Sequence, residues 1–400
     1  MVFLQSGTLR RVATNTQAPA GPALRALLAG SALLASVGPV LYPLGLWLVA
    51  RRRPDPIPPA HLRWPTLTCV VAAYRESGVI EAKVADLLAQ DYPSMVELVV
   101  VAEDAPTADA ARRAGAHVVQ PPDRVGKSAA LGLGVAAGTG EVIVVSDANA
   151  TLAPGSLRAL GRWFDDPTVG AVAGEKRVRS MASGAGEGAY WAFESRLKRW
   201  ENRMGSSVCL VGELGAVRRS LWRDVPADVA VDDLWIALDV VEQGARVVYE
   251  PAAVAHEDPS PTLADDVQRR TRIIAGALDV LWRRRTLLRG HGQVSLQLWG
   301  HKVVRSAFAP SAHVLLAICS LAAARRGPRR APLAALLALG HIVGATATVA
   351  HAADRPLPGP LVPVGQFGLL QAVALGGLWR FLRGEQLGRW PKLDRSGPPT

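Results

Sequence analysis

Two oxygen-bearing side chains directly follow an apolar run, and they are the first residues in the sequence that could do chemistry. Asp147 and Asn149 come after residues 141–146. If the run is a strand, their spacing places both side chains on the same side, where they could bind one divalent cation. Mg²⁺ and Mn²⁺ prefer such oxygen ligands and bridge to diphosphates. The other interpretation is an Asx turn that caps the following segment.

A second pair of carboxylates, Asp232 and Asp233, precedes a helical pattern that ends near Gly244. At a helix start they could simply be partners of the helix dipole. One of them could instead be a general base, because the helix start keeps a carboxylate ionised and ready to accept a proton. Further on, Arg269 and Arg272 share one helical face. They could clamp a diphosphate or lie against anionic lipid.

Weaker signals follow two other apolar runs and one glycine. Tyr74 and Glu76 could hold a planar base by stacking and hydrogen bonding, or could be an ordinary strand end. Asp104 could accept hydrogen bonds from a ribose hydroxyl or a base N–H, or could cap a helix. Lys127 follows a glycine but lacks the upstream glycine of a P-loop, because two prolines stand there. It could still contact a phosphate at a helix start.

The segments that must position these residues alternate between two patterns. Short apolar runs predict strands at residues 67–73, 97–102, 141–146, 169–174 and 247–249, and helical patterns lie at 78–90, 108–115, 127–138 and 154–164. This alternation predicts an α/β fold with an open, mostly parallel sheet and helices on both faces. Right-handed crossovers bring the loops that follow the strands to one edge, where ligands bind.

The composition excludes several classes of protein. The chain has 400 residues, of which 49% are hydrophobic and 20% charged, so it is too apolar for intrinsic disorder. Its three cysteines have no paired spacing, which excludes a disulfide framework and a cysteine zinc site. The net charge of +11 suits partners that carry phosphate. Because the basic residues cluster beside apolar segments, we expect membrane lipid and no nucleic acid among the partners.

Residues 26–50 contain no charge and are long enough to cross a hydrocarbon core of ~30 Å. A cleaved signal peptide is the alternative, although its apolar region is usually shorter. Three arginines at 51–53 place the following domain in the cytoplasm by the positive-inside rule. Residues 306–324, 331–353 and 361–378 could each cross as well. Because basic residues follow both the first and the last of these segments, three full crossings from a cytoplasmic domain cannot keep these basic groups in the cytoplasm, and the sequence leaves the number of crossings open.

The organisation expected for an integral protein of the cell membrane therefore has six parts. They are an N-terminal tail (1–25), a transmembrane anchor (26–50), a linker rich in Pro and Arg (51–65), a cytoplasmic domain (66–290), a C-terminal membrane region of two or three segments (291–380) and a basic tail (381–400).

The order and spacing of the motifs resemble the inverting glycosyltransferases of family 2, in the membrane-embedded branch that includes polysaccharide synthases. The resemblance covers roughly residues 67–281. Residues 74–76 stand at a Tyr-Asn-Glu strand end, 126–131 at Gly-Lys-x-x-Ala-Leu, 147–149 at Asp-x-Asp, 232–233 at Glu-Asp and 269–273 at Gln-x-x-Arg-Trp. The resemblance implies a GT-A-like fold, a nucleotide-sugar donor, Mg²⁺ or Mn²⁺ held by Asp147 and Asn149, and Asp233 as general base. Tyr74, Glu76, Asp104, Lys127, Arg269 and Arg272 are then candidates for donor binding.

Two departures from the family pattern bear on the acceptor. Asn149 is neutral where the family has an acid, and Ile273 replaces the Trp of the last motif, which belongs to the acceptor site in chain-building enzymes. In that motif only Arg272 matches, unless Gln268 takes the Gln position by a one-residue slip. Trp191 and Glu213 lie in family-like stretches at the usual acceptor side.

The hypothesis is a membrane-bound transferase that moves a sugar from a nucleotide-diphosphate-sugar donor, with a UDP-sugar expected, to a glycan or lipid acceptor with inversion. The altered last motif favours transfer of one sugar to a membrane lipid, whereas the several C-terminal segments favour polymer synthesis. A catalytically inactive subunit that binds nucleotide sugars is a further alternative.

Overall fold

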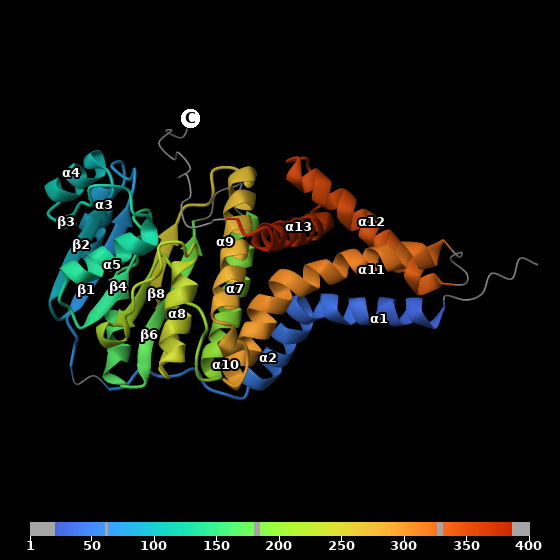
Figure 1. The fold of residues 1–400 in the computed structure, drawn as a ribbon, viewed down its shortest axis with the longest axis horizontal. Coiled ribbons are helices and arrows are strands. Elements are labelled where there is room, and N and C mark those ends of the chain that lie inside the picture. Colours follow the sequence, from blue (N-terminus) through green and yellow to red (C-terminus); the bar gives the residue numbers. More distant parts are fainter. Residues whose placement is uncertain (1–20, 61–62, 180–184, 326–330, 386–400) are drawn as a thin grey trace, which may run out of the picture.

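The computed structural model describes residues 21–60, 63–179, 185–325 and 331–385. An α/β body is joined to a group of long apolar helices that extend away from it (Figure 1). The strands of the body are β1 (Leu67–Ala73), β2 (Val96–Ala102), β3 (His117–Val119), β4 (Val142–Val145), β5 (Thr151–Leu152), β6 (Val169–Val178), β7 (Gly215–Arg218) and β8 (Arg246–Glu257). Its main helices are α3 (Ile80–Leu88), α4 (Ala105–Arg113), α5 (Lys127–Ala137), α6 (Ser156–Gly161), α7 (Ala185–Arg203), α8 (Asp232–Glu242) and α9 (Leu263–Arg283).

All eight strands form one sheet in the order β3-β2-β1-β4-β7-β6-β8-β5. β1 pairs in parallel with β2 and β4, and β6 pairs in parallel with β8. β7 is antiparallel to both β4 and β6, and β5 is antiparallel to β8. The predicted α/β sheet is confirmed, and its centre is mixed because β7 runs against its neighbours.

The apolar runs became buried strands because both faces of the sheet are covered. Val70 and Ile143 pack with Leu131 of α5 on one face, whereas Cys69 and Val144 belong to the core on the other face. Along each of these strands, successive side chains alternate between the two faces, as the period of two requires for a strand covered on both sides. The parallel strands β1, β2 and β4 therefore end at a common edge, where the candidate residues follow.

In the described part of the chain, four helical segments are long and apolar enough to cross a membrane: Pro22–Ala50, Gln293–Ala324, Pro332–Ala352 and Gly359–Leu382. The first consists of α1 (Pro22–Ser36), the π-helical η1 (Val37–Leu41) and α2 (Tyr42–Ala50). The second consists of α10 (Gln293–Gln297), the π-helical η5 (Leu298–Phe308) and α11 (Ala309–Ala324). The last two are α12 (Pro332–Ala352) and, after a short turn, α13 (Val362–Leu382). Large side chains such as Leu33 and Leu336 are 61% and 65% exposed, as expected for a surface in contact with lipid.

The C-terminal ends of α11 and α13 lie at different distances from the α/β body. α11 lies beside α1, and its end at Arg325 is far from the body (Figure 1). α13 instead packs along α9, where a Cβ on Gly377 would lie 2.6 Å from Ile274 Cγ2. Arg380 follows one turn later, next to the body. Basic residues thus lie at opposite ends of these helices, and the positive-inside rule cannot hold for both.

Buried polar contacts join the body to the apolar helices. His301 of η5 lies between two carboxylates of α7, with Nδ1 2.8 Å from Glu201 Oε1 and Nε2 3.0 Å from Glu194 Oε2. Tyr42 of α2 donates to the same Glu201 oxygen at 2.8 Å. In the linker, Asp55 accepts hydrogen bonds from Arg199 and Arg203 of α7, which hold its pKa below the ordinary value. Both the N-terminal and C-terminal segments are therefore fixed to α7.

Candidate active site

The loop after β4 carries Asp147 and is held from two sides. Lys83 of α3 donates from Nζ to the carbonyl oxygen of Ala150 at 2.7 Å, and Ser146 donates to the carbonyl oxygen of Glu213 at 2.7 Å. Lys83 is almost fully buried, and this burial lowers its pKa. Because both supports come from buried groups, the position of Asp147 is fixed by the body and not by the loop alone.

Lys127, the first residue of α5, bridges two carboxylates that are far apart in the sequence. Its Nζ lies 2.9 Å from Asp147 Oδ1 and 3.3 Å from Asp232 Oδ2. Burial opposes the charged form, but the two carboxylates raise the pKa of Lys127 above its ordinary value. Gly212 adjoins this pair, because a Cβ there would lie 3.5 Å from the ammonium and 3.8 Å from Asp147 Oδ2, in ordinary contact. Asp147, Lys127 and Asp232, which belong to three separate segments, therefore lie together.

Asp233 follows at the start of α8 and accepts a hydrogen bond from the Leu234 N–H at 2.7 Å. Burial and the neighbouring charge of Asp232 raise the pKa of Asp233 to about 6, although Lys127 acts in the opposite direction. A carboxylate with a pKa near 6 is ionised at neutral pH and is a stronger base than an ordinary aspartate. The site thus contains a group suited to accept a proton.

Asn149 lies in a second, adjoining cluster around the buried Lys176 of β6. Asn149 Nδ2 donates to Glu257 Oε1 at 3.1 Å. Lys176 is paired with Glu257 and also lies 2.5 Å from Glu213 Oε1, and the Trp191 ring covers it at 4.5 Å. Burial would raise the pKa of Glu257, but Lys176 and Arg269 lower it to about 2, so it is ionised. The two acceptor-side candidates and the second metal candidate therefore share one ionic cluster.

Of the arginines on α9, Arg269 contacts this cluster through Glu257, with Nη1 3.5 Å from Oε2. Arg272 is mostly buried, and burial lowers its pKa, whereas the charges of Asp232 and Asp147 raise it. Arg270 points elsewhere: it is paired with Asp266. The predicted shared face of Arg269 and Arg272 is thus the one directed toward the carboxylates.

Tyr74, Glu76 and Asp104 form a group at the ends of β1 and β2. Arg124 stacks on the Tyr74 ring at 4.2 Å. The Glu76 N–H donates to Thr107 Oγ1 at 2.9 Å, and Asp104 caps α4 by accepting from the Thr107 N–H at 3.0 Å. This cap makes α4 begin at residue 105, earlier than the helix predicted at 108–115. For Asp104 the structure shows the capping role that the sequence left open.

This group is linked to the Lys127 cluster by the chain between β2 and α5. Glu103 Oε1 accepts a hydrogen bond from the Gly126 N–H at 2.8 Å, and Gly126 has φ +87°, a conformation that favours glycine. The start of α5 is therefore tied to the end of β2, and the two groups lie along one edge of the sheet.

Lys176 and Glu257 were missed in the sequence. Glu257 is the last residue of β8 and obeys the same strand-end rule that identified Asp147. The signal was hidden because Pro251 interrupts the apolar run after Tyr249. Lys176 lies within β6, where a charged residue gives no indication that it is buried.

A close contact between α9 and the residues just before α8 lies next to the two aspartates. A Cβ at Gly276 would lie 2.7 Å from Val231 Cγ2 and 3.0 Å from Ala230 Cβ. We expect Gly276→Ala to lower the free energy of unfolding by about 1–3 kcal/mol through overpacking and to reduce activity, because residues 230–231 immediately precede Asp232. Thermal melting and turnover would be measured together. Gly188→Ala on α7, where nothing lies within 4 Å, is the control; equal melting temperatures for the two variants would contradict the expectation.

Comparison with known proteins bears on the family and the fold of this chain. The family model described as "Glycosyltransferase like family 2" matches residues 65–276. An N-acetylglucosaminyltransferase of Rhizobium meliloti is 24% identical over 255 residues, which cover 56% of this chain and 59% of the relative. A poly-beta-1,6-N-acetyl-D-glucosamine synthase of Staphylococcus aureus is 25% identical over 232 residues, covering 54% and 56%. The chain thus spans about half the length of the curated relatives it matches.

A solved structure resembles nearly the whole chain. The mannosyltransferase PcManGT of Pyrobaculum calidifontis, in complex with GDP-Man and Mn²⁺, superposes with a TM-score of 0.73 at 26% identity. The match covers 90% of this chain and 99% of that one. The mixed sheet with carboxylates along one edge is a GT-A-like glycosyltransferase fold. The chain belongs to glycosyltransferase family 2, as its sequence motifs indicated.

Proposed function

We propose that this protein transfers a sugar from a nucleoside-diphosphate sugar to an acceptor hydroxyl with inversion at the anomeric carbon. The observation that carries the proposal is the convergence of Asp147, Lys127 and Asp232 from three separate segments, with Asp233 adjacent. Its test is a screen of nucleotide sugars against the purified full-length protein, with Mg²⁺ or Mn²⁺ present and release of nucleoside diphosphate as the readout. Absence of release with every donor would favour the inactive binding subunit instead.

In the proposed reaction Asp233 takes the proton from the acceptor hydroxyl. The acceptor oxygen forms a bond to the anomeric carbon while the bond to the diphosphate breaks, and the electron pair leaves with the nucleoside diphosphate. Attack from the opposite face inverts the stereocentre. Lys127, Arg269 and Arg272 supply positive charge on the side where the leaving group gains negative charge.

The donor set fits a hard divalent cation. Asp147 offers carboxylate oxygens, and because the Asn149 amide nitrogen is directed to Glu257, its carbonyl oxygen is directed away from that acid. Mg²⁺ is often held by one or two carboxylates together with substrate phosphates, and PcManGT was solved with Mn²⁺ and its donor. We assign Asp147 and Asn149 as the residues that would hold Mg²⁺ or Mn²⁺, which would offset the charge of the diphosphate.

Removal of divalent cations by EDTA is expected to abolish release of nucleoside diphosphate, and added Mn²⁺ or Mg²⁺ is expected to restore it. Asp147→Asn should raise the cation concentration needed for half-maximal release, because it removes the charged ligand. Asp109→Asn, at an exposed pair with Arg112, is the control. Full activity in EDTA would show that the reaction needs no such ion.

The pKa of Asp233 predicts the pH dependence. Because the base must be ionised and its pKa is about 6, kcat/KM should rise with pH to about 6 and then level off. Each unit below that value should reduce it about tenfold. The pH–rate profile of the wild type checks this, and Asp233→Asn should lack the acidic limb. A profile that stays flat between about pH 5 and 7 would contradict the assignment of Asp233 as the base.

For location, we propose an integral protein of the cell membrane with the α/β body in the cytoplasm. The four apolar segments support membrane insertion, and three arginines directly after α2 support this orientation. The proposed donor is a UDP-sugar, and the screen above distinguishes it from other nucleotide sugars. Product length on a gel would separate transfer of a single sugar from polymer synthesis.

A further inference from the structure

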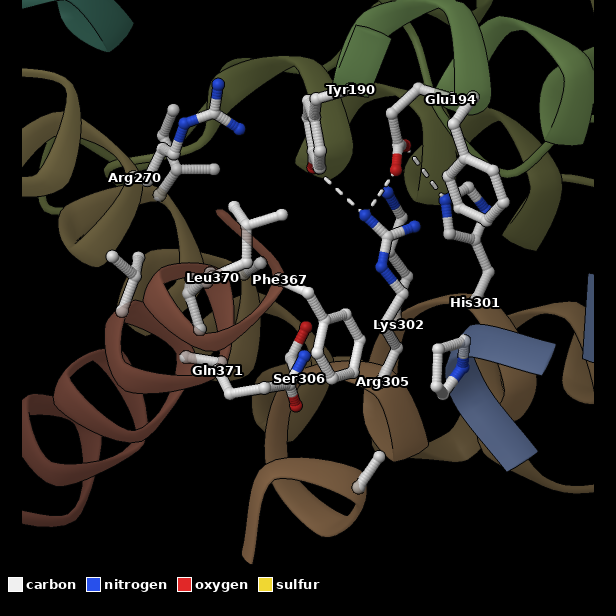
Figure 2. Close-up of a pocket in the computed structure, with 18 of the residues that line it drawn as sticks. Tyr190, Glu194, Arg270, His301, Lys302, Arg305, Ser306, Phe367, Leu370 and Gln371 are labelled. Carbon is white, nitrogen blue, oxygen red and sulfur yellow. Dashed lines mark hydrogen bonds and ion pairs between the residues drawn. The ribbon is translucent and has the colours of Figure 1, made fainter. Parts of the chain in front are cut away.

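A cavity of about 390 Å³ lies where the α/β body meets the apolar helices, between α7, α9, η5 and α13 (Figure 2). One side is hydrocarbon. It is formed mainly by α9 and α13, through Ile273, Ile274, Ala277, Phe367, Leu370 and Val373. Because α13 and α11 belong to segments able to cross a membrane, this side adjoins the part of the molecule that lipid would surround.

The other side of the cavity is cationic. In the described residues its lining includes Arg269, Arg270, Lys302 and Arg305 but a single carboxylate, Glu194. Glu194 is already paired with Arg305, which also donates to the Tyr190 hydroxyl at 3.0 Å (Figure 2). Arg269 and Arg270 are also paired with Glu257 and Asp266, which do not line the cavity. The charged groups that face the cavity itself are mostly cationic and are complementary to an anion.

Within the part of the chain that the structure describes, two hydrogen-bond donors on this cationic side have no acceptor. Among the described residues, Arg305 Nη1 and Trp191 Nε1 are buried atoms without a hydrogen-bond partner. Both can only donate, so they call for acceptor oxygens. η5, which carries Lys302 and Arg305, is a π-helix, and such segments occur often at functional sites. Phosphate oxygens next to a hydrocarbon chain would satisfy both sides of the cavity.

Two residues connect the cavity to the ionic cluster of the active site. Arg269 lines the cavity and contacts Glu257, which accepts the hydrogen bond from Asn149. Trp191 lines it as well and covers Lys176 at 4.5 Å. A head group bound here therefore contacts Arg269 and is linked through Glu257 to Asn149, both assigned to the reaction, as an acceptor requires and a merely structural lipid does not.

We propose that this cavity binds a membrane lipid with a long hydrocarbon chain and a phosphate-bearing head group, and that this lipid is the acceptor. The acceptor role rests on the proposed function. The hydrocarbon lies along α9 and α13, the phosphate contacts the arginines, and the head-group hydroxyl receives the sugar while its proton goes to Asp233 and the nucleoside diphosphate leaves.

The first test measures binding to the full-length protein in detergent by native mass spectrometry, with polyprenyl phosphate and the uncharged polyprenol as probes. The phosphate should bind at least about tenfold more tightly, because only it pairs with the cations. Leu370→Trp, which fills the hydrocarbon side, and Arg270→Gln, which removes a charge, should each weaken it about tenfold or more.

Two matched variants control for changes that are not specific to the cavity. Leu336→Trp adds the same bulk to an exposed position on α12, and Arg283→Gln removes an arginine from the same helix as Arg270. Both should bind polyprenyl phosphate as the wild type does. Equal binding of the two probes, or wild-type binding by folded Leu370→Trp and Arg270→Gln, would overturn the proposal. If Leu370→Trp does not fold, Arg270→Gln against Arg270→Lys decides, and only the lysine should retain binding.

Release of nucleoside diphosphate, measured on the same preparation, separates the two proposals. Stimulation of release by a lipid phosphate that bears a hydroxyl, absent with a soluble oligosaccharide, supports the acceptor role. Release that responds only to the soluble oligosaccharide overturns that role while the proposed transferase function stands. No release with any donor overturns the transferase function and the acceptor role together, and the binding measurement still decides the lipid site.

Discussion

Asp233→Asn is expected to lower kcat by about 10²–10⁴-fold, the contribution typical of a positioned general base. The amide has nearly the same shape, and its oxygen can still accept the Leu234 N–H, but it cannot take up a proton. Donor binding should change little, because Lys127 remains paired with Asp147 and Asp232. Turnover and donor affinity measured on the same preparation would show a loss in kcat alone.

The stability of this variant gives an independent check. Burial raises the pKa of Asp233 in the folded protein, so at neutral pH its charge destabilises the folded state. Replacing it with a neutral amide should therefore leave the melting temperature equal or higher while activity falls. Glu242→Gln, at the other end of α8, is the control and should keep full activity. Wild-type turnover by folded Asp233→Asn would remove this residue from the mechanism.

Lys176→Met is expected to lower the free energy of unfolding by about 3–5 kcal/mol, because it leaves carboxylates buried without their cation. The Lys176 side chain is 1% exposed, and its partners Glu213 and Glu257 are 12% and 5% exposed. Activity should fall as well, since Glu257 holds Asn149. Thermal melting of the full-length protein in detergent measures the loss of stability.

A double variant tests whether the pairing is the cause. Adding Glu257→Gln to Lys176→Met removes one of the carboxylates that have lost their cation, and it should recover part of the lost stability. Substitutions at independent sites would not show this coupling. Arg112→Met, at a pair whose arginine is 48% exposed, should cost less than about 1 kcal/mol. The same melting temperature for Lys176→Met and the wild type would mean that the cluster contributes no net stability.

The sequence predicted those parts of the site that follow from local rules. β1, β2 and β4 are continuous apolar runs, and the residues after them reach the sheet edge whatever the rest of the fold does. Asp147, Lys127 and Asp232 could be placed together because strand ends and helix starts share that edge. The family resemblance then supplied the roles that geometry alone could not.

Other features depend on contacts between distant segments and left no local signal. β7 has four residues and runs antiparallel between β4 and β6, which no run length could indicate. The helix expected at 154–164 is split, because α6 ends at Gly161 and a 3₁₀ turn follows. A Cβ at Gly161 would lie 2.6 Å from the Tyr92 hydroxyl, so Tyr92 packs closely against the end of α6. The position of α13 against α9 likewise depends on Gly377, which leaves room for the Ile274 side chain. Hydropathy along the sequence does not reveal such a fit between two helices.

The imidazole of His301 contacts two residues of α7 that are seven positions apart, Glu194 and Glu201. These two residues lie about two turns apart, so α7 can neither rotate about its axis nor slide without breaking both hydrogen bonds. The body is therefore joined rigidly to the apolar helices, so a change in the tilt of these helices would turn Trp191 and its surroundings with them. For the same reason, a fragment that ends at residue 290 would lack His301, the partner of two buried acids, and we expect the isolated α/β body to be less stable than in the full-length protein.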